Sequence, residues 1–314
     1  MIEYASNRVP LKLLSQSDGV LAVITETQGT SYRTVGTMMA FGIDGKRTGS
    51  LSSGCIEDDI ADHAKRALAT GQAIALRYGT GSPFFDLKLP CGGGLSILLI
   101  PNPDRSLLGD LLQRGALRQT VDLSIGLTDG SLTLGALAEP GRLAVKLEPE
   151  LRFWVYGHGV EAISFALMTQ AAGYDVTLFG QDSLQSDLSR IGPLNIQTVA
   201  SFRSHVCPVP DSRTAVTLFF HDHENEARLL AQLLPSQAFF IGAQGSLRAR
   251  TRLLDELTTL GVPPADLSRL RPDFGLIPSC RDPRTLAVSV MAHVLAVAGD
   301  RSTLTADGRT ANPA

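Results

Sequence analysis

Apolar and polar positions follow two different patterns along this chain of 314 residues, and the change falls near residue 150. Before that point, short apolar runs predict strands over 20–28, 37–45 and 94–101, and in "TVDLSIGL" and "GRLAVKLEP". Apolar residues at helical spacing predict one helix over 56–71, stopped by Gly71, and another near 105–115. We therefore expect a mixed α+β domain over residues 1–148.

After residue 151, predicted strands and helices alternate. Strand, glycine turn, helix and strand are expected over 152–180. They are followed by the strand "TAVTLFF", the helix "ENEARLLAQLL", the strand "QAFFIGA", the helix "SLRARTRLLDELTTLG" and a last helix over 283–299. Such alternation is typical of a parallel sheet with crossover helices. The predicted fold class is α/β, with a Rossmann-like domain over 149–300 and a disordered polar tail over 301–314.

Composition excludes several classes of function. The net charge is −3 and no block of Lys or Arg occurs, so neither a nucleic acid nor a membrane surface is an expected partner. No apolar run is long enough to span a bilayer, and the first residues lack the apolar core of a signal peptide. The four cysteines form no CxxC pair, so we expect reduced thiols in a cytoplasmic protein and no structural zinc.

The stretch "YGHGVEA" places Gly157 and Gly159 between a predicted strand and a predicted helix, where a helix N-terminus can hold a phosphate. A dinucleotide site also needs an acid after the second strand to hold a ribose, and Gly180 stands there. NAD(P) is therefore not expected. The alternative is that these glycines only allow close packing. His158 could contact an anion or be merely solvated.

One cysteine lies in "SLSSGCIEDDI", where Cys55 follows Gly54 and precedes a predicted helix that Ser52 or Ser53 could cap. The helix dipole favours a thiolate, whereas the acids at 57–59 oppose it, so the sequence leaves the ionisation of Cys55 open. The alternative is a small buried side chain.

Two other loops carry candidate chemistry. Cys91 precedes Gly92 and Gly93 in "LPCGGG", a backbone free enough to approach a ligand closely. Arg33 lies in "QGTSYRTVGT", which is either an anion clamp or a plain polar hairpin loop. Cys207 and Cys280 lie among prolines and are expected to be packing residues.

The motifs "GTSYRTVGTMM", "GSLSSGCIEDD", "LPCGGG", "VYGHGVEA" and "IGAQGSLRARTRLL" occur in this order. Together they resemble the xanthine dehydrogenase accessory protein family, of the XdhC/CoxI type, over about residues 15 to 299. The resemblance implies a chaperone, not an enzyme, that transiently binds the molybdenum cofactor in its molybdopterin form. It also implies a cysteine desulfurase that sulfurates the held cofactor, a molybdenum hydroxylase such as xanthine dehydrogenase that receives it, and a homodimer.

This resemblance also suggests a site. Soft thiolates suit molybdenum, so Cys55 and Cys91 are the predicted metal ligands. The predicted cofactor-binding residues are these two cysteines with Arg33, Gly54, Gly92, Gly93, Gly157, His158, Gly159, His221, Asp222, Gly245, Ser246 and Arg248. His221 and Asp222 could instead cap the helix that follows them. Two other functions stay open, an NAD(P)-dependent oxidoreductase and a scaffold that joins hydroxylase and desulfurase without holding cofactor.

Overall fold

The computed structural model divides the chain into two compact units between Pro149 and Glu150. The structure describes residues 6–29, 31–52, 54, 56–80, 92–136, 139–181, 194–220 and 225–306, with side chains as far as Gly299. The predicted fold class is confirmed, because the first unit mixes helices with antiparallel sheets and the second contains a parallel sheet.

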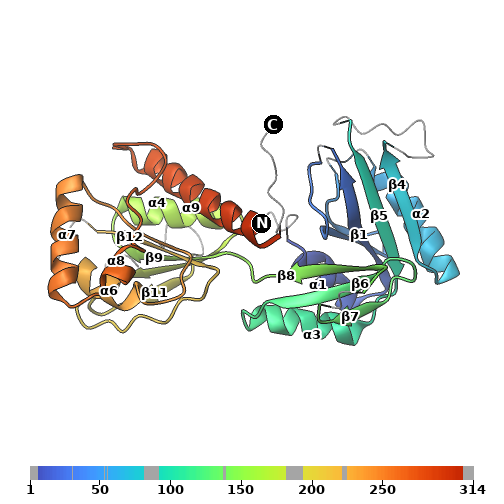
Figure 1. Cartoon of the computed structure of the whole chain (residues 1–314), viewed down its shortest axis with the longest axis horizontal. Coiled ribbons are helices and arrows are strands. Elements are labelled where there is room, and N and C mark those ends of the chain that lie inside the picture. Colours follow the sequence, from blue (N-terminus) through green and yellow to red (C-terminus); the bar gives the residue numbers. More distant parts are fainter. Residues whose placement is uncertain are drawn as a thin grey trace. The chain divides into compact units, whose positions relative to one another are not determined.

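The first unit contains a five-stranded antiparallel sheet in the order β3-β2-β1-β5-β4 and a three-stranded sheet in the order β7-β6-β8 (Figure 1). Its elements are α1 (Arg8–Gln16), β1 (Gly19–Gln28), β2 (Met38–Gly42), β3 (Arg47–Gly49), α2 (Glu57–Thr70), β4 (Ile74–Gly79), β5 (Gly94–Pro101), α3 (Arg105–Ala116), β6 (Val121–Gly126), β7 (Leu132–Leu134) and β8 (Arg142–Leu147).

Strand β1 is apolar on both faces because both faces are covered. Val20, Ala22 and Ile24 pack in a cluster with α2, while Leu21 and Val23 pack in a second cluster with α1, α3 and the smaller sheet. Side chains alternate between the two faces of a strand, so a continuous apolar run fills both clusters at once. This double burial makes β1 the central strand of the unit.

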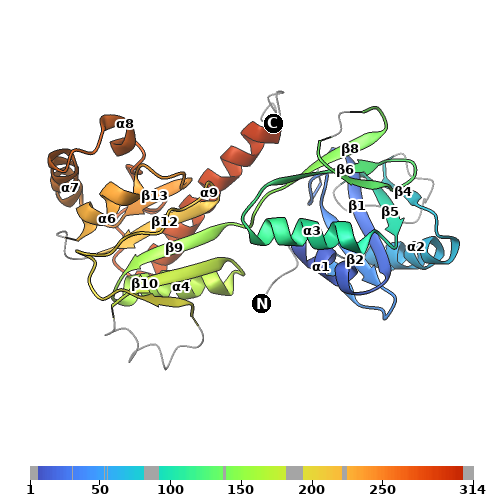
Figure 2. The same ribbon diagram turned by 90° about the horizontal axis from the view of Figure 1, so that it is seen from below.

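The second unit is a parallel sheet of five strands in the order β11-β10-β9-β12-β13. Its elements are β9 (Arg152–Gly157), α4 (Val160–Ala171), β10 (Asp175–Gly180), β11 (Ile196–Thr198), β12 (Thr214–Phe219), α6 (Glu226–Leu233), β13 (Phe240–Ala243), α7 (Leu247–Thr259), α8 (Pro264–Leu267) and α9 (Pro283–Ala306). Helices α4 and α9 lie side by side on one face of the sheet, and α6 covers the other (Figures 1 and 2).

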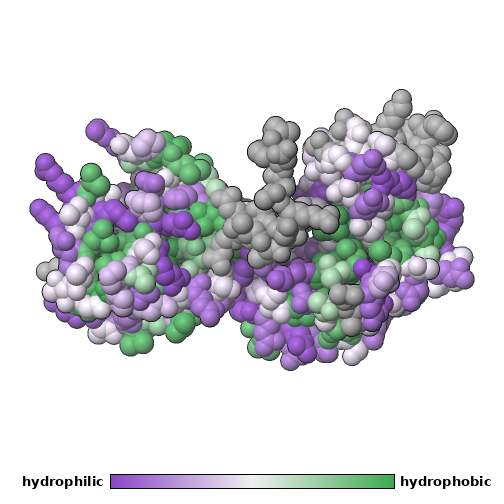
Figure 3. Space-filling model, viewed as in Figure 1, coloured by the Kyte–Doolittle hydropathy of each residue, from purple (hydrophilic) through white to green (hydrophobic). Residues whose placement is uncertain are grey.

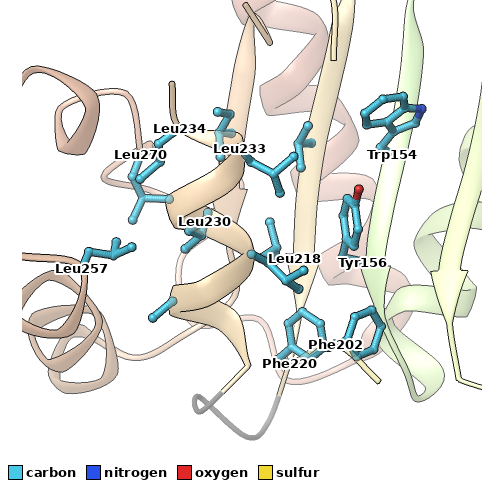
Figure 4. Close-up of a cluster of buried hydrophobic side chains, with 14 of the residues drawn as sticks. Trp154, Tyr156, Phe202, Leu218, Phe220, Leu230, Leu233, Leu234, Leu257 and Leu270 are labelled. Carbon is cyan, nitrogen blue, oxygen red and sulfur yellow. The ribbon is translucent and has the colours of Figure 1, made fainter. Parts of the chain in front are cut away.

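Each face of the parallel sheet has its own core. Trp154 and Tyr156 of β9 pack with Leu218 of β12 and with the leucines of α6 and α7 (Figure 4). Phe153 and Val155 point to the opposite face and pack against α4 and α9. The strand order 3-2-1-4-5 places the reversal of direction between β9 and β12, which is where Rossmann-like folds bind ligands.

The structure adds elements that the pattern did not predict. These are α1, β3, β4, β7, β11 and α8. The last helix extends to Ala306, so residues 301–306 are helical and not part of a disordered tail. Residues 307–314 of that predicted tail lie outside the described residues.

The surface of both units mixes hydrophilic residues with exposed hydrophobic ones (Figure 3). In the second unit the exposed hydrophobic residues include Leu247, Leu276 and Ile277, which belong to the site described below. Within the described ranges, no helix combines the length and the apolar character that a membrane span requires.

Phe165 of α4 is fully buried between the helix and the sheet, so Phe165→Ala should leave a cavity. We expect the free energy of unfolding of the second unit to fall by about 3–5 kcal/mol. Trp154, the only tryptophan in the chain, reports the unfolding of this unit by fluorescence in a denaturant titration. Val160→Ala on the same helix is the control, since Val160 is exposed. Equal losses in both variants would contradict this packing.

Candidate functional site

Three glycine-rich loops of the first unit leave its large sheet at the same end. The register pairs Gln28 at the end of β1 with Gly94 at the start of β5, and Gly79 at the end of β4 with the same glycine. Met39 near the start of β2 pairs with Gly49 at the end of β3. The loops over 29–37 and 80–93 therefore begin and end at one end of this sheet, and the segment over 50–56 leaves β3 at the same end and leads to α2.

Two of the glycines at this end of the sheet, Gly29 and Gly93, lie in contact. A Cβ atom on Gly29, whose φ is +69°, would lie 3.7 Å from the Cα atom of Gly93. Gly54 has a φ of +96° and Gly92 one of +68°, so both occupy the left-handed region that glycine tolerates best. Gly54 and Gly92, which stand next to the two cysteines in the sequence, therefore have the backbone conformation that glycine favours.

Arg77 of β4 links three neighbouring strands at this end of the sheet by hydrogen bonds. Its guanidinium donates hydrogen bonds to Glu26 Oε2 at 3.0 Å, to Gln28 Oε1 at 2.6 Å and to Ser96 Oγ at 2.8 Å, while Nε donates to the carbonyl of Thr80 at 3.1 Å. These contacts join β1, β4 and β5 where the loops emerge. Arg77 was not predicted from the sequence, because its partners lie up to 51 residues away in the chain.

The loop that carries Cys55 is held by Glu57. The Ser52 backbone N–H donates to Oε1 at 2.9 Å, its hydroxyl donates to Oε2 at 2.6 Å, and the Ile56 N–H donates to Oε2 at 3.3 Å. Burial raises the pKa of Glu57, but the hydrogen bonds from Ser52 outweigh it and leave this pKa below its ordinary value. The carboxylate is therefore a fixed clamp on the loop.

Ser52 was expected to cap the helix α2, and the structure shows that it does not. The residue before α2 is Ile56, with no side-chain hydrogen bond to the helix, so Ser52 is not the N-cap. The other two acids also have separate partners, because Asp58 pairs with Arg47 at 2.6 Å and Asp59 accepts from the Tyr78 hydroxyl at 2.5 Å. The three acids thus bind three different partners: the loop at Ser52, Arg47 of β3 and Tyr78 of β4. Their charges also lie in the first turn of α2, where the helix dipole favours them.

The described residues do not include every predicted ligand. Cys55 and Cys91 lie outside them, as do His221 and Asp222. Arg33 is half-buried in the loop after β1, where its backbone N–H and carbonyl both bond with the Ser31 hydroxyl. Among the described side chains, no group of three histidines, cysteines or acids could hold a metal ion.

In the second unit, the predicted glycine turn joins β9 to α4. Gly157 has a φ of +143°, and a Cβ atom there would collide with the carbonyl oxygen of Phe219 at the end of β12. Gly159, with a φ of +92°, directly precedes α4. His158 between them turns its ring edge to Phe220 at 6.0 Å, and its buried Nδ1 has no hydrogen-bond partner among the described residues.

A cavity of about 850 Å³ opens at the carboxyl ends of β12 and β13. The turn Gln244–Ser246 and the first turn of α7 form one side of it, and Ser246 caps α7 by accepting from the Ala249 N–H at 3.2 Å. Gly245 and Ser246 of the predicted site line this cavity. Arg248 is exposed on α7, and the arginine that lines the cavity is Arg250.

The opposite side of the cavity is a loop over 272–282 that is fastened to α9. The Ile277 N–H donates to Ser289 Oγ at 2.7 Å, and the Gly275 N–H donates to His293 Nδ1 at 3.4 Å. Burial, and then the nearby Arg271, lower the pKa of His293, which favours the neutral ring that accepts this hydrogen bond. Ser279 has a φ of +55° in this loop.

The two described cysteines have different surroundings. Burial raises the pKa of Cys207 to about 11, as expected for a packing residue. Cys280 is half-buried, also packs against the core beneath α4 and α9, and donates from Sγ to the Ile277 carbonyl at 3.2 Å. It lines the cavity as well, which its prediction as a packing residue did not include.

Both halves of the chain match known families. Residues 13–79 match the XdhC and CoxI family, and residues 153–294 match the XdhC Rossmann domain. The chain belongs to the XdhC and CoxI family. The predicted resemblance is thereby confirmed over both units.

Relatives of this family member match over nearly its whole length. It is 32% identical to the molybdenum cofactor insertion chaperone PaoD of Escherichia coli (strain K12), over 91% of this chain and 85% of that protein. It is 23% identical to a probable xanthine dehydrogenase subunit of Bacillus subtilis (strain 168), over 90% and 94% of the two chains. A crystal structure of a xanthine dehydrogenase from Bacillus halodurans shares the fold, with a TM-score of 0.77, 21% identity and coverage of 94% and 96%.

Removing the Glu57 clamp should destabilise the first unit. We expect Glu57→Ala to lower its free energy of unfolding by about 2 kcal/mol at neutral pH, because three hydrogen bonds to a carboxylate are lost. Urea titrations at several pH values, with protection of peptides from residues 2–149 read by mass spectrometry, measure this change. Asp62→Ala, which removes an exposed acid of the same helix, is the control and should change little.

The pH dependence follows from the lowered pKa of Glu57. A carboxylate whose pKa falls on folding stabilises the fold above its unfolded pKa, and this contribution disappears as the pH drops through the folded value. The difference between wild type and Glu57→Ala should therefore shrink on acidification below the ordinary pKa of glutamate. A difference that stays constant into acid would show that the carboxylate charge is not responsible.

Proposed function

We propose that this chain is a molybdenum cofactor insertion chaperone that binds the cofactor transiently and delivers it to a molybdenum hydroxylase apoenzyme. The observation that carries the proposal is the match to PaoD, which extends over 91% of this chain at 32% identity. The two family matches add support, since one falls in the first unit and the other spans most of the Rossmann unit.

The residues present fit such a cofactor. The cavity of about 850 Å³ is within the range of small-molecule sites, and it is lined by Gln244, whose buried side-chain oxygen accepts no hydrogen bond from the described residues. Gly157 lets the β9–α4 turn pass close to β12, where no larger residue fits. When bound, the cofactor supplies a metal held by sulfur, for which thiolates are suitable ligands.

Each group of residues has a proposed role. Cys55 and Cys91 hold the metal side, and the glycine loops with Gly54, Gly92 and Gly93 let the backbone come close. Arg33, Arg248 and the turns at Gly157–Gly159 and Gly245–Ser246 bind the anionic and polar parts. His221 and Asp222, which directly follow the cavity residue Phe220, add polar contacts.

The proposal includes partners and setting. The chain holds the cofactor while a cysteine desulfurase supplies the terminal sulfur, then transfers it to the hydroxylase, and it is not itself an enzyme. It acts in the cytoplasm as a homodimer. We do not expect NAD(P) as its cofactor, because β10 ends at Gly180, and glycine cannot supply the carboxylate that holds a ribose in dinucleotide sites.

The thiol assignment is tested by titrating the purified chain with molybdenum cofactor. Cys55→Ala and Cys91→Ala should each weaken binding at least about tenfold, the effect of losing one charge-assisted contact. Cys207→Ala is the matched control, because this thiol is partly buried in the core and its pKa is raised. Normal binding by both variants would refute the assignment of these cysteines as ligands.

The same preparations separate the alternatives. A scaffold would bring hydroxylase and desulfurase together but bind no cofactor in this titration. An oxidoreductase would bind NADH at micromolar concentration and lose it in Gly159→Trp, which fills the turn before α4.

A further inference from the structure

The lining of the cavity at the ends of β12 and β13 includes Gln244, whose side-chain oxygen has no hydrogen-bond partner in the described part of the chain. Gln244 Oε1 is buried and accepts no hydrogen bond from any described residue. The residue is fixed in place, because its backbone N–H donates to the Leu218 carbonyl at 2.9 Å, one strand away. A buried acceptor left unpaired is unfavourable, so a donor bound in the cavity that Gln244 lines would favour a rotation of this side chain that turns the oxygen toward it.

Flat apolar walls stand next to this oxygen. Phe220 and Phe274 both line the cavity. The ring of Phe220 is held by Phe202 at 5.0 Å in an edge-on contact, and Figure 4 shows the two rings together beyond Leu218 at the end of the buried cluster. Phe274 is held in the same way by Phe219 at 5.1 Å. Rigid aromatic walls of this kind favour a planar ligand.

A second polar atom without a described partner, Nδ1 of His158, lies near Phe220. His158 Nδ1 is buried without a partner among the described residues, and its ring lies 6.0 Å from that of Phe220. In the strand order β9-β12-β13, His158 follows β9 and Gln244 follows β13, so the two atoms stand on either side of the end of β12.

The charge around the cavity favours an anionic ligand. Helix α7 has no acid in its first turn and instead carries Arg248 and Arg250 there, while the one acid among the described residues that line the cavity, Asp273, lies close enough to Arg250 to interact with its charge. Cations at a helix N-terminus repel one another and interact unfavourably with the helix dipole. An anion bound near them reduces both effects. Arg250 is held in the wall by donating to the carbonyls of Leu270 and Arg271, at 3.1 and 2.6 Å.

We propose that this cavity binds an anionic nitrogen heterocycle, whose plane lies against Phe220 and Phe274 and whose N–H edge donates to Gln244. That the heterocycle is the pterin of the molybdenum cofactor rests on the function proposed above. The chemistry alone also fits a nucleotide base with its phosphate, so the experiment has one arm for each source.

Isothermal titration of the whole chain with neopterin monophosphate, and separately with CMP, GMP and AMP, tests this site. At least one of these probes should bind wild-type protein with micromolar affinity. Strongest binding by the pterin assigns the site to the cofactor's ring, and strongest binding by a nucleotide assigns it to a base. No binding by any of the four probes would overturn the proposal.

Gln244→Met keeps the length of the side chain and removes the acceptor, so it should weaken the bound probe about tenfold. Gln113→Met makes the same change at an exposed position of α3 and should bind as wild type does. The denaturation midpoint reported by Trp154 shows whether the Gln244 variant is folded. Unchanged affinity in a folded Gln244→Met protein would overturn the assignment of this residue.

Cys280 locates the ligand without any substitution, because this thiol lines the cavity. A saturating probe should slow its alkylation by iodoacetamide at least fivefold, as measured by peptide mass spectrometry, and leave Cys207 unchanged. A bound probe that does not protect Cys280 would place the ligand elsewhere and refute the site.

The two proposals fail separately. Protection of Cys280 by a probe, in a chain that does not bind molybdenum cofactor, supports the cavity and refutes the chaperone function. Binding of the molybdenum cofactor without protection of Cys280 supports the function and refutes the cavity as its site.

Discussion

The backbone hydrogen bonds of β1 determine where the glycine-containing loops of the first unit leave its large sheet. This strand pairs antiparallel with β2 on one side and with β5 on the other, and its last residue, Gln28, lies opposite Gly94. That pairing sends the loops over 29–37, 50–56 and 80–93 out at one end of the sheet. A shift of one residue would exchange the side chains that β1 sends into the two clusters, so the packing that stabilises the unit also fixes the loops.

The second unit reaches a similar result with parallel strands. The carboxyl ends of β9, β12 and β13 lie next to one another, which brings the Gly157 turn, Phe220 and the start of α7 to one edge. The close passage of Gly157 beside Phe219 needs a residue without a side chain. Loop 272–282 then closes the far wall because Ser289 and His293 of α9 hold it. Both units thus place polar or glycine-rich turns at the ends of well-packed strands.

Much of this architecture could be predicted from local pattern. Long apolar runs such as β1 and β5, and helices with a clear stop such as Gly71, lie at or within a few residues of their predicted positions. Short strands such as β7 and β11, of three residues each, carry too little pattern to be recognised. Helix α1 was missed because Pro10 and several polar residues interrupt it, although proline is tolerated in a first turn.

The candidate site was harder to predict than the fold, because its contacts join residues that are distant in the sequence. The glycine-rich loops can be recognised from their composition, but strand register decides that they leave the sheet at the same end. In the sequence, Glu57 is only one of the acids that oppose a thiolate at Cys55, and only the fold shows that it holds Ser52. Gln244 carries no motif at all, since an unpaired oxygen is a property of packing. Cys280 lines a cavity because α9 fastens a loop that is distant from the strands in sequence.

The central claim is that this chain holds the molybdenum cofactor. The most direct measurement is the molybdenum and pterin content of the chain after production in cells that make the cofactor together with a hydroxylase apoenzyme. A chain that holds the cofactor should carry molybdenum and pterin in equal amounts, and should lose both when the hydroxylase is loaded. A chain that forms a complex with the hydroxylase yet carries neither molybdenum nor pterin would contradict this claim.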